Sequence, residues 1–266
     1  MTRNQRLHIR VDDGAGPAVV LLHGFPLDGS VWVPVAAYLC KKYRVIVPDL
    51  RGFGLSHLAN PGRQFAISEL ASDVAEQLHA MGVAKAVVAG LSMGGYVMLE
   101  LWRNYPELVA GLAIVNSKAE SDSPAGKQGR DETAALARSH GASAIAERMI
   151  AKMLHVNNLA PNSTVRSQLM AVMEACPAET IALASIAMRD RADFSGSLAQ
   201  LSVPARVIVG AADQIIPVEL ARATAQAMPV GRLVVVPGAG HLSPLESPAA
   251  VAGAIEGLAI EAFGEQ

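Results

Sequence analysis

The chain has 266 residues, of which 51% are hydrophobic and 17% charged, and its formal net charge at pH 7 is −2. This composition is typical of a globular protein with enough apolar residues for a large core. The charge balance provides no basic patch for nucleic acid. No apolar run approaches the roughly 20 residues of a membrane helix, and the polar segment 1–13 does not resemble a signal peptide. We expect a cytoplasmic protein with no nucleic-acid or membrane partner.

Two cysteines, Cys40 and Cys176, lie far apart in segments with helical character. We interpret them as buried free thiols of a protein from a reducing compartment. Neither belongs to a paired Cys/His spacing of the kind that binds zinc. The sequence therefore implies no metal and no organic cofactor, and it leaves a homo-oligomer open.

In the first part of the chain, short apolar runs alternate with amphipathic helical segments. The runs predict strands at 7–11, 18–22, 43–48 and 112–115, with a further strand leading into Gly90. Helices are expected at 31–42, 67–81 and 96–104, and Asp28 and Ser30 are N-cap candidates for the first. The continuous apolar runs suit strands that are buried on both faces.

The character of the chain changes between about residues 117 and 197, where alanine, methionine and arginine dominate. Helical spacing appears at 132–138, 144–154, 165–175 and 179–188, with short breaks between. Strands resume at 207–209 and 233–236, with helices at 220–228 and 251–263. We expect an α/β core formed by 1–116 and 198–266, with a mostly parallel central sheet, helices on both faces, and a helical cap inserted at 117–197.

The segment from Val87 to Tyr96 contains Gly-x-Ser-x-Gly directly after an apolar run and directly before a helix. This pattern predicts a sharp strand-to-helix turn with Ser92 at its corner in strained backbone geometry. Glycines on either side let the flanking backbones pass closely. The N–H of Met93, first in the helix, would then point at whatever Ser92 attacks. A strand–helix turn without a catalytic function would have the same pattern. Assigning Ser92 as a nucleophile therefore requires further functional residues elsewhere in the chain.

Two such residues follow later strands. Asp213 comes just after the run 207–209, and His241 follows 233–236 through a short loop with Gly238 and Gly240. Functional residues of parallel sheets lie at the carboxyl ends of the strands. A serine hydroxyl needs a neighbouring base and a carboxylate that orients that base. We therefore predict Ser92 as nucleophile, His241 as base and Asp213 as orienting acid, although each of the latter two alone is also explained as a capping or loop residue.

The loop His23-Gly24-Phe25-Pro26 follows the strand 18–22. Gly24 permits a close backbone approach, and the Phe25 N–H is free to donate to a developing oxyanion, whereas Pro26 has no N–H. We expect His23 to brace this loop and not to act as the base. Asp49 and Arg51, which follow the strand 43–48, are interpreted as a charged pair that braces a glycine-rich loop.

Taken together, these motifs resemble the α/β-hydrolase superfamily over essentially the whole chain. The matching pieces are His23-Gly24-Phe25-Pro26, Asp49-x-Arg51-Gly52-x-Gly54-x-Ser56, Gly90-Leu91-Ser92-Met93-Gly94-Gly95, Gly210-x-x-Asp213 and Gly238-x-Gly240-His241. The resemblance implies the α/β-hydrolase fold, the catalytic triad Ser92, Asp213 and His241, and an oxyanion hole from the backbone N–H groups of Phe25 and Met93. It also implies that the insertion at 117–197 is the family's cap, which roofs the substrate pocket.

Within the superfamily the chain most resembles the esterase, enol-lactonase and cofactor-free haloperoxidase (perhydrolase) branches. Ser92 stands where dehalogenases of this fold carry aspartate, which excludes their chemistry and epoxide hydrolysis. Leu91 stands where carbon–carbon hydrolases often have asparagine. The expected activity is a carboxylesterase or lactonase, with N-acyl homoserine lactones among the candidate substrates. The alternatives are a perhydrolase, a 3-oxoadipate enol-lactonase-like enzyme and, outside enzymes, a hydrolase-fold lactone receptor.

The substrate depends on cap residues whose orientation the spacing does not fix. Helical spacing favours packing roles for the cap's apolar side chains: Met149, Met153, Met170, Met173, Met188, Leu154, Ile145, Ile150 and Ile181. An inward-facing cap arginine would clamp a substrate carboxylate, whereas a solvated position is commoner. The cap arginines are Arg130, Arg138, Arg148, Arg166, Arg189 and Arg191.

Overall fold

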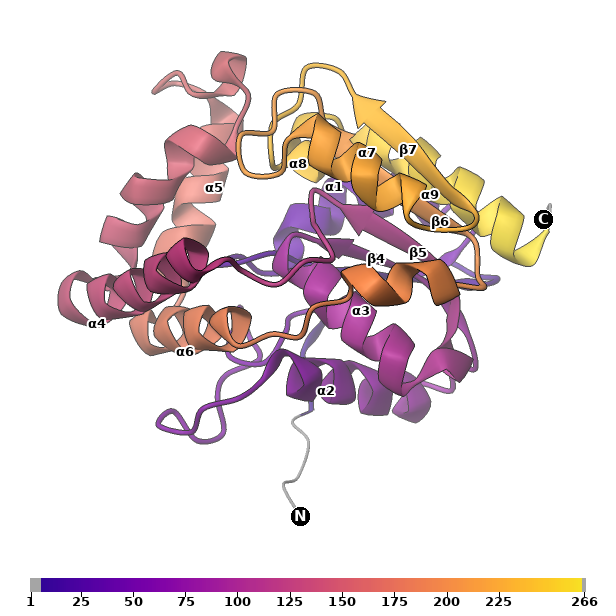
Figure 1. Cartoon of the computed structure of the whole chain (residues 1–266), viewed down its shortest axis with the longest axis horizontal. Coiled ribbons are helices and arrows are strands. Elements are labelled where there is room, and N and C mark those ends of the chain that lie inside the picture. The colour runs from indigo at the N-terminus through magenta and orange to yellow at the C-terminus, as the bar shows by residue number, and fades with distance from the viewer. Residues whose placement is uncertain (1–5, 265–266) are drawn as a thin grey trace.

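A computed structural model describes residues 6–264, which contain one seven-stranded sheet with the strand order β1-β3-β2-β4-β5-β6-β7 (Figure 1). Only β1 runs antiparallel to its neighbour β3, and the remaining pairs are parallel. The predicted mostly parallel sheet is therefore confirmed. The strands are β1 (Ile9–Asp13), β2 (Ala18–Leu22), β3 (Arg44–Pro48), β4 (Ala86–Leu91), β5 (Val109–Val115), β6 (Ala205–Gly210) and β7 (Gly231–Val236).

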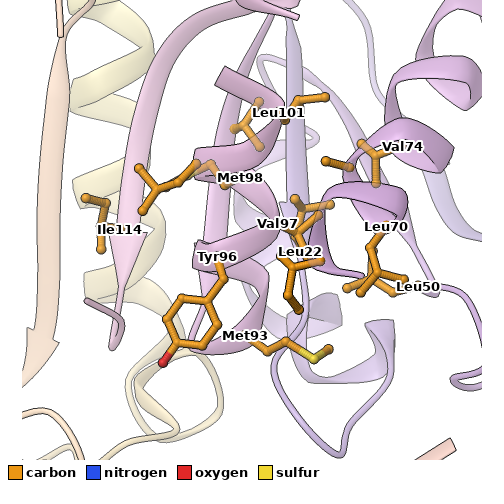
Figure 2. Close-up of a cluster of buried hydrophobic side chains, with 14 of the residues drawn as sticks. Leu22, Leu50, Leu70, Val74, Met93, Tyr96, Val97, Met98, Leu101 and Ile114 are labelled. Atoms are coloured by element: carbon orange, nitrogen blue, oxygen red, sulfur yellow. The ribbon is translucent and has the colours of Figure 1, made fainter. Parts of the chain in front are cut away.

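Helices cover both faces of the sheet. Successive strand residues point to opposite sides, and in the central strands the residues on both sides are apolar. Val20, Val88 and Val207 belong to a core shared with α2 (Ile67–Ala80), α3 (Met93–Asn104) and α7 (Val218–Gln226). Their neighbours along the strands pack on the other face against α1 (Val33–Leu39) and α9 (Pro248–Phe263). Figure 2 shows Val97 of α3 beside Leu22 of β2, with Leu70 of α2 close by. The central strands β2, β4 and β5 are buried along their whole length.

Most element boundaries differ from the predicted ones by a few residues. The strand predicted at 7–11 ends two residues later, because β1 continues through Asp12 and Asp13 after a register irregularity between Ile9 and Val11. The helix expected at 31–42 begins earlier as the 3-10 helix η1 (Gly29–Trp32), continues as α1 and ends sooner, at Leu39. Asp28 caps η1 by accepting the Ser30 N–H, as its position predicted.

Between β5 and β6 the chain forms α4 (Pro124–Met153), η3 (Val156–Asn158), α5 (Thr164–Ala175), α6 (Ala178–Arg189) and η4 (Ser195–Gln200). We call α4 to α6 the helical insertion, and Figure 1 shows it gathered at one side of the sheet. The two helices predicted at 132–138 and 144–154 are one element bent at Gly141, where φ is 78°. A glycine accepts this left-handed conformation without a Cβ penalty, so the bend forms there.

Apolar side chains join the helical insertion to both cores of the sheet. Ile145, Ile181 and Met188 pack with the α2–α3 core, whereas Leu154 and Met173 pack with the α1–α9 core. Burial of this kind confirms the packing role predicted for the insertion's apolar residues. The helices therefore share a hydrophobic core with the sheet and do not form a separate body.

An ion-pair cluster around Asp122 fixes the segment between β5 and α4 to the end of α6. The carboxylate contacts Arg191 at 2.9 Å and Arg130 at 3.0 Å, and the Arg191 guanidinium stacks 4.1 Å above the Tyr96 ring. Burial alone would raise the pKa of the Asp122 carboxyl, but the hydrogen bonds and charges of the two arginines lower that pKa well below its usual range. Both side chains of the Asp122–Arg191 pair are buried.

The two cysteines are free thiols, as predicted. Cys176 is buried, and burial raises the pKa of its thiol to about 12, whereas Cys40 is only partly buried because it ends α1 near the surface. Within residues 6–264, no single helix has the length and apolar composition to cross a membrane. The helices α5 and α6 have that length and composition only when taken together, and they are bent by 92° relative to each other.

Replacing Asp122 with asparagine should lower the free energy of unfolding by about 3 kcal/mol at pH 7, because Arg191 loses the carboxylate that compensates its burial. The stabilisation should be fully present above the carboxyl's unfolded pKa of about 4 and decline as the pH falls through its lower folded pKa. Urea unfolding of wild type and Asp122→Asn at pH 7 and pH 3 measures both effects.

Asp131→Asn provides a matched control in the same insertion, because Asp131 pairs with Arg189 at the surface. An exposed pair should contribute less than about 1 kcal/mol. An Asp122→Asn difference that is equal at the two pH values would contradict the assignment of the stabilisation to the ionised carboxylate.

Candidate active site

Ser92 lies at the corner between β4 and α3 with φ 50° and ψ −113°, a strained conformation for a residue with a side chain. The two flanking glycines make the corner possible. A Cβ at Gly90 would lie 2.3 Å from the Gly94 carbonyl oxygen, and one at Gly94 would lie 2.2 Å from that of Leu22. The predicted close backbone passage is therefore present, and it leaves the Ser92 side chain half-buried at the sheet's carboxyl edge.

The loop after β2 packs directly against this corner. A Cβ at Gly24 would lie 3.2 Å from the Ser92 Cβ, a tighter contact than side chains usually make, so the loop approaches the corner closely. Among the hydrogen bonds of residues 6–264, none uses the Phe25 N–H, and the Met93 N–H is the first of α3 and has no acceptor within the helix. Neither N–H is used by these hydrogen bonds, so both are free to donate, as the predicted oxyanion hole requires. The Phe25–Pro26 peptide is cis.

Asp213 and His241, which the sequence places after two different strands, form a buried pair. The His241 Nδ1–H donates to Asp213 Oδ2 at 2.9 Å. Asp213 Oδ1 also accepts the N–H groups of Ile215 and Ile216. Burial alone would raise the pKa of the Asp213 carboxyl, but His241 and the hydrogen bonds that the carboxylate accepts lower that pKa below its usual range. An ionised Asp213 fixes the His241 tautomer with Nε2 free to accept a proton.

The three residues follow three strands of the same sheet: Ser92 follows β4, while Asp213 and His241 follow the adjacent strands β6 and β7, and β5 lies between the two groups. In the part of the chain that the structure describes, no hydrogen bond joins the Ser92 hydroxyl to the His241 ring. Bonds of this kind are often long in a ligand-free site and tighten when substrate binds. The structure thus joins Asp213 to His241 and places Ser92 at the same edge of the sheet.

Asn116, which sequence reasoning missed, connects the residues of this edge. It follows β5 in a left-handed conformation with φ 45° and is fully buried. Its Nδ2 donates to Asp213 Oδ2 at 2.8 Å and to the Gly240 carbonyl at 3.2 Å, while its Oδ1 accepts the Ser243 hydroxyl. The amide therefore holds the acid and the peptide before His241 at once. Its place directly after a buried strand was the one signal available.

The other polar residues of the edge support loops. His23 accepts the Leu50 N–H at Nε2 and donates from Nδ1 to the Gly24 carbonyl, both at 2.9 Å, which confirms its predicted bracing role. Burial lowers the pKa of His23, so the ring is neutral as these bonds require. The predicted pair of Asp49 with Arg51 is wrong.

Asp49 and Arg51 each brace the glycine-rich loop through a partner that is distant in the sequence. Asp49 binds Arg10 and accepts the N–H groups of Gly29 and Leu55. Arg51 forms a double hydrogen bond with Asp73 of α2, at 2.6 Å for each contact. The prediction that Asp49 pairs with Arg51 is wrong because both partners come from elements outside the motif.

Most of the insertion's arginines are already paired. Arg138 binds Glu179, Arg189 binds Asp131 and Asp190, and Arg130 and Arg191 share Asp122. Arg191 is the buried member of this set, and its guanidinium also donates to the backbone carbonyls of Met188 and Glu120. These contacts commit the arginines to the protein itself. Across residues 6–264, no group of three acidic, histidine or cysteine side chains has the arrangement of a metal site.

Comparison with known proteins agrees with this geometry. The family model described as alpha/beta hydrolase fold matches residues 17–248. The chain is 38% identical to a thermophilic esterase from Thermogutta terrifontis, solved with malate bound, with a TM-score of 0.90 over 94% of this chain and 92% of that one.

Two lactonases are also similar. The enol-lactonase from Burkholderia xenovorans LB400 shares 28% identity with a TM-score of 0.87 over 96% of each chain. A 3-oxoadipate enol-lactonase from Acinetobacter baylyi is 26% identical over 87% of this chain and 84% of its own length. The residues matched by the family model, 17–248, include the helical insertion and Ser92, Asp213 and His241.

Replacing Asn116 with alanine should lower the turnover of any ester that the site hydrolyses by about 10- to 100-fold, the range for a lost hydrogen bond to a charged group. Asp213 would lose one donor, and the Gly240 carbonyl another. Steady-state kinetics on a p-nitrophenyl ester measures the loss. Asn104→Ala is the control, because Asn104 contacts only its own helix. Equal activity of Asn116→Ala and wild type would show that Asp213 and Gly240 are held adequately without the amide.

Proposed function

The chain belongs to the α/β-hydrolase fold family, and we propose that it is a serine hydrolase that cleaves carboxylic esters or lactones through an acyl-enzyme on Ser92. The observation that carries the proposal is the buried Asp213–His241 hydrogen bond at the carboxyl edge of the sheet that also presents Ser92 on its strained turn. A hydrolase acting on esters or lactones is also supported by the esterase and enol-lactonase relatives.

In the proposed first step, Ser92 Oγ attacks the substrate carbonyl carbon while His241 Nε2 accepts the hydroxyl proton. Asp213 stabilises the imidazolium through the bond to Nδ1. The N–H groups of Phe25 and Met93 donate to the tetrahedral oxyanion, whose charge develops only in the transition state. Collapse of the intermediate expels the alkoxide, which takes the proton from His241.

In the second step, water attacks the acyl-enzyme with His241 again as base, and Ser92 leaves as the free hydroxyl. An ordinary ester releases its alcohol before this step. A lactone keeps its alcohol tethered to the acyl group, so a single hydroxy acid leaves at the end. The same residues perform both reactions, and the choice between them lies in the shape of the surrounding pocket.

Four of the six arginines within residues 117–197 are paired with acidic residues, which favours neutral substrates over those that carry a carboxylate. A substrate with a carboxylate of its own, such as an enol-lactone acid, needs a cation that is free to bind it. Arg130, Arg138, Arg189 and Arg191 are engaged by acidic partners of the protein. We therefore propose a carboxylesterase or lactonase for modest apolar acyl groups, with N-acyl homoserine lactones among the candidate substrates.

Ser92→Ala tests the proposal on p-nitrophenyl esters of increasing chain length and on a parallel panel of lactones. The variant should lose about 10⁵- to 10⁶-fold in kcat, as loss of the nucleophile does in such a catalytic unit. Ser139→Ala is the matched control, because Ser139 is exposed on α4 and contacts only its own helix and the adjacent His140. A near-normal rate in Ser92→Ala would overturn the proposal.

Two outcomes would point to the alternative functions. Peracid formation faster than acid release, on one ester in the presence of hydrogen peroxide, would identify a perhydrolase. Tight lactone binding with turnover no faster than minutes would identify a receptor. A faster rate on lactones than on esters would narrow the proposed activity to a lactonase, and the preferred acyl length would report the depth of the pocket.

A further inference from the structure

Glu246 joins the loop of the candidate base to the helical insertion. It is the last residue of the short helix α8 (Ser243–Glu246) and lies half-buried. One carboxylate oxygen, Oε2, accepts the N–H of Gly240 at 2.6 Å. The other, Oε1, accepts the N–H of His155 at 2.7 Å and the Nδ2 of Asn158 at 2.8 Å. We call these three contacts the Glu246 bridge.

The two ends of the Glu246 bridge belong to different parts of the fold. Gly240 directly precedes His241, whereas His155 and Asn158 lie at η3, just after the long helix α4 of the insertion. A second contact runs parallel to the bridge, because the Leu242 N–H donates to the Met153 carbonyl at 3.1 Å. The residues before and after His241 are therefore both hydrogen-bonded, directly or through one carboxylate, to the same short segment of the insertion.

The backbone at Gly240 packs directly against the backbone that follows α4 of the insertion. A Cβ at this position would lie 2.7 Å from the His155 nitrogen and 2.8 Å from the Leu154 carbonyl carbon. The Gly240 carbonyl is held from the other side by Asn116 Nδ2 at 3.2 Å. One peptide group next to His241 is thus fixed to the sheet, and the preceding one is fixed to the insertion through Glu246.

A carboxylate suits this bridge for a chemical reason. It offers two acceptor oxygens and no donor, and all three of its partners are N–H groups. Hydrogen bonds from N–H groups to an ionised carboxylate are stronger than neutral ones. An amide in its place would present an NH₂ group to one of the two sides, where only donors face it.

We infer that Glu246 is a positioning residue. It couples the position of the helical insertion relative to the sheet to the position of His241 for proton transfer. The inference rests on the proposed function, because it concerns the base of that reaction. Glu246 does not touch the reacting atoms; it acts through the Gly240 peptide. A displacement of the segment from Met153 to Asn158 displaces the base, so the alignment of His241 depends on the insertion being in place.

The first test is kinetic and uses Glu246→Gln and Glu246→Ala in the full-length protein. Both variants should lose about 10-fold or more in kcat on a p-nitrophenyl ester, with KM within about 3-fold of wild type, because substrate contacts are unchanged while base alignment is lost. Glu219→Gln is the matched control, since Glu219 is an exposed helix residue paired only with Arg222. Wild-type kcat in folded Glu246→Gln would overturn the inference.

The second test distinguishes coupling from a purely local effect on His241. Amide hydrogen exchange should accelerate at both Gly240 and His155 in Glu246→Gln, and at neither in Glu219→Gln. Asn158→Ala should lower kcat in the wild-type background and have little further effect in Glu246→Gln, because its acceptor is already altered there. A loss of kcat with unchanged exchange at His155 would overturn the link to the insertion.

Failure of the proposed function gives a different result from failure of the bridge. A wild-type protein that hydrolyses none of the esters or lactones would refute the serine-hydrolase proposal. Hydrogen exchange would then decide the bridge alone: faster exchange at Gly240 and His155 together in Glu246→Gln supports the coupling, and unchanged exchange at either position overturns it.

Discussion

At Ser92, strand β4 turns into helix α3 within a single residue, and the two backbones approach more closely than side chains permit. A Cβ at Gly90 would meet the Gly94 carbonyl at 2.3 Å. The same close packing brings Gly24 of the neighbouring loop to the Ser92 side chain. One constraint therefore places Ser92 at the corner, directly before the first residue of α3 and against the loop that contains Phe25. The glycines are required by this close backbone packing, and the position of Ser92 in the candidate site follows from the same packing.

Much of this edge was predictable from the sequence because parallel strands impose a simple rule. Their carboxyl ends lie side by side, so polar residues that directly follow apolar runs are brought together from distant parts of the chain. Asp213 and His241 illustrate it, since their predicted meeting agrees with a 2.9 Å hydrogen bond. The seven-stranded sheet, with helices on both faces, follows from the same alternation of runs. The catalytic roles of Asp213 and His241 with Ser92 remain a proposal.

Contacts between side chains without a periodic pattern were not predictable. Asn116 is an ordinary amide in the sequence, and its two acceptors lie 97 and 124 residues away. Asp49 and Arg51 are neighbours in the sequence, yet each binds a partner from another element, Arg10 and Asp73. A buried charge pairs with whichever group the fold brings to it, since an unpaired one is costly. Sequence proximity therefore says little about such pairs.

The loop of His241 is hydrogen-bonded to both the sheet side of the fold and the helical insertion. Ser92 is fixed by the β4–α3 corner, and Asp213 by the backbone after β6 and by Asn116. The loop of His241 is held to the sheet through the Gly240 carbonyl and to the insertion through the Gly240 N–H. The sheet and the helical insertion thus both hold the same residue, Gly240, where no side chain would fit. Under the proposed function and the coupling inferred through Glu246, a change in the insertion that reshapes the substrate pocket also shifts His241, and this links specificity to rate.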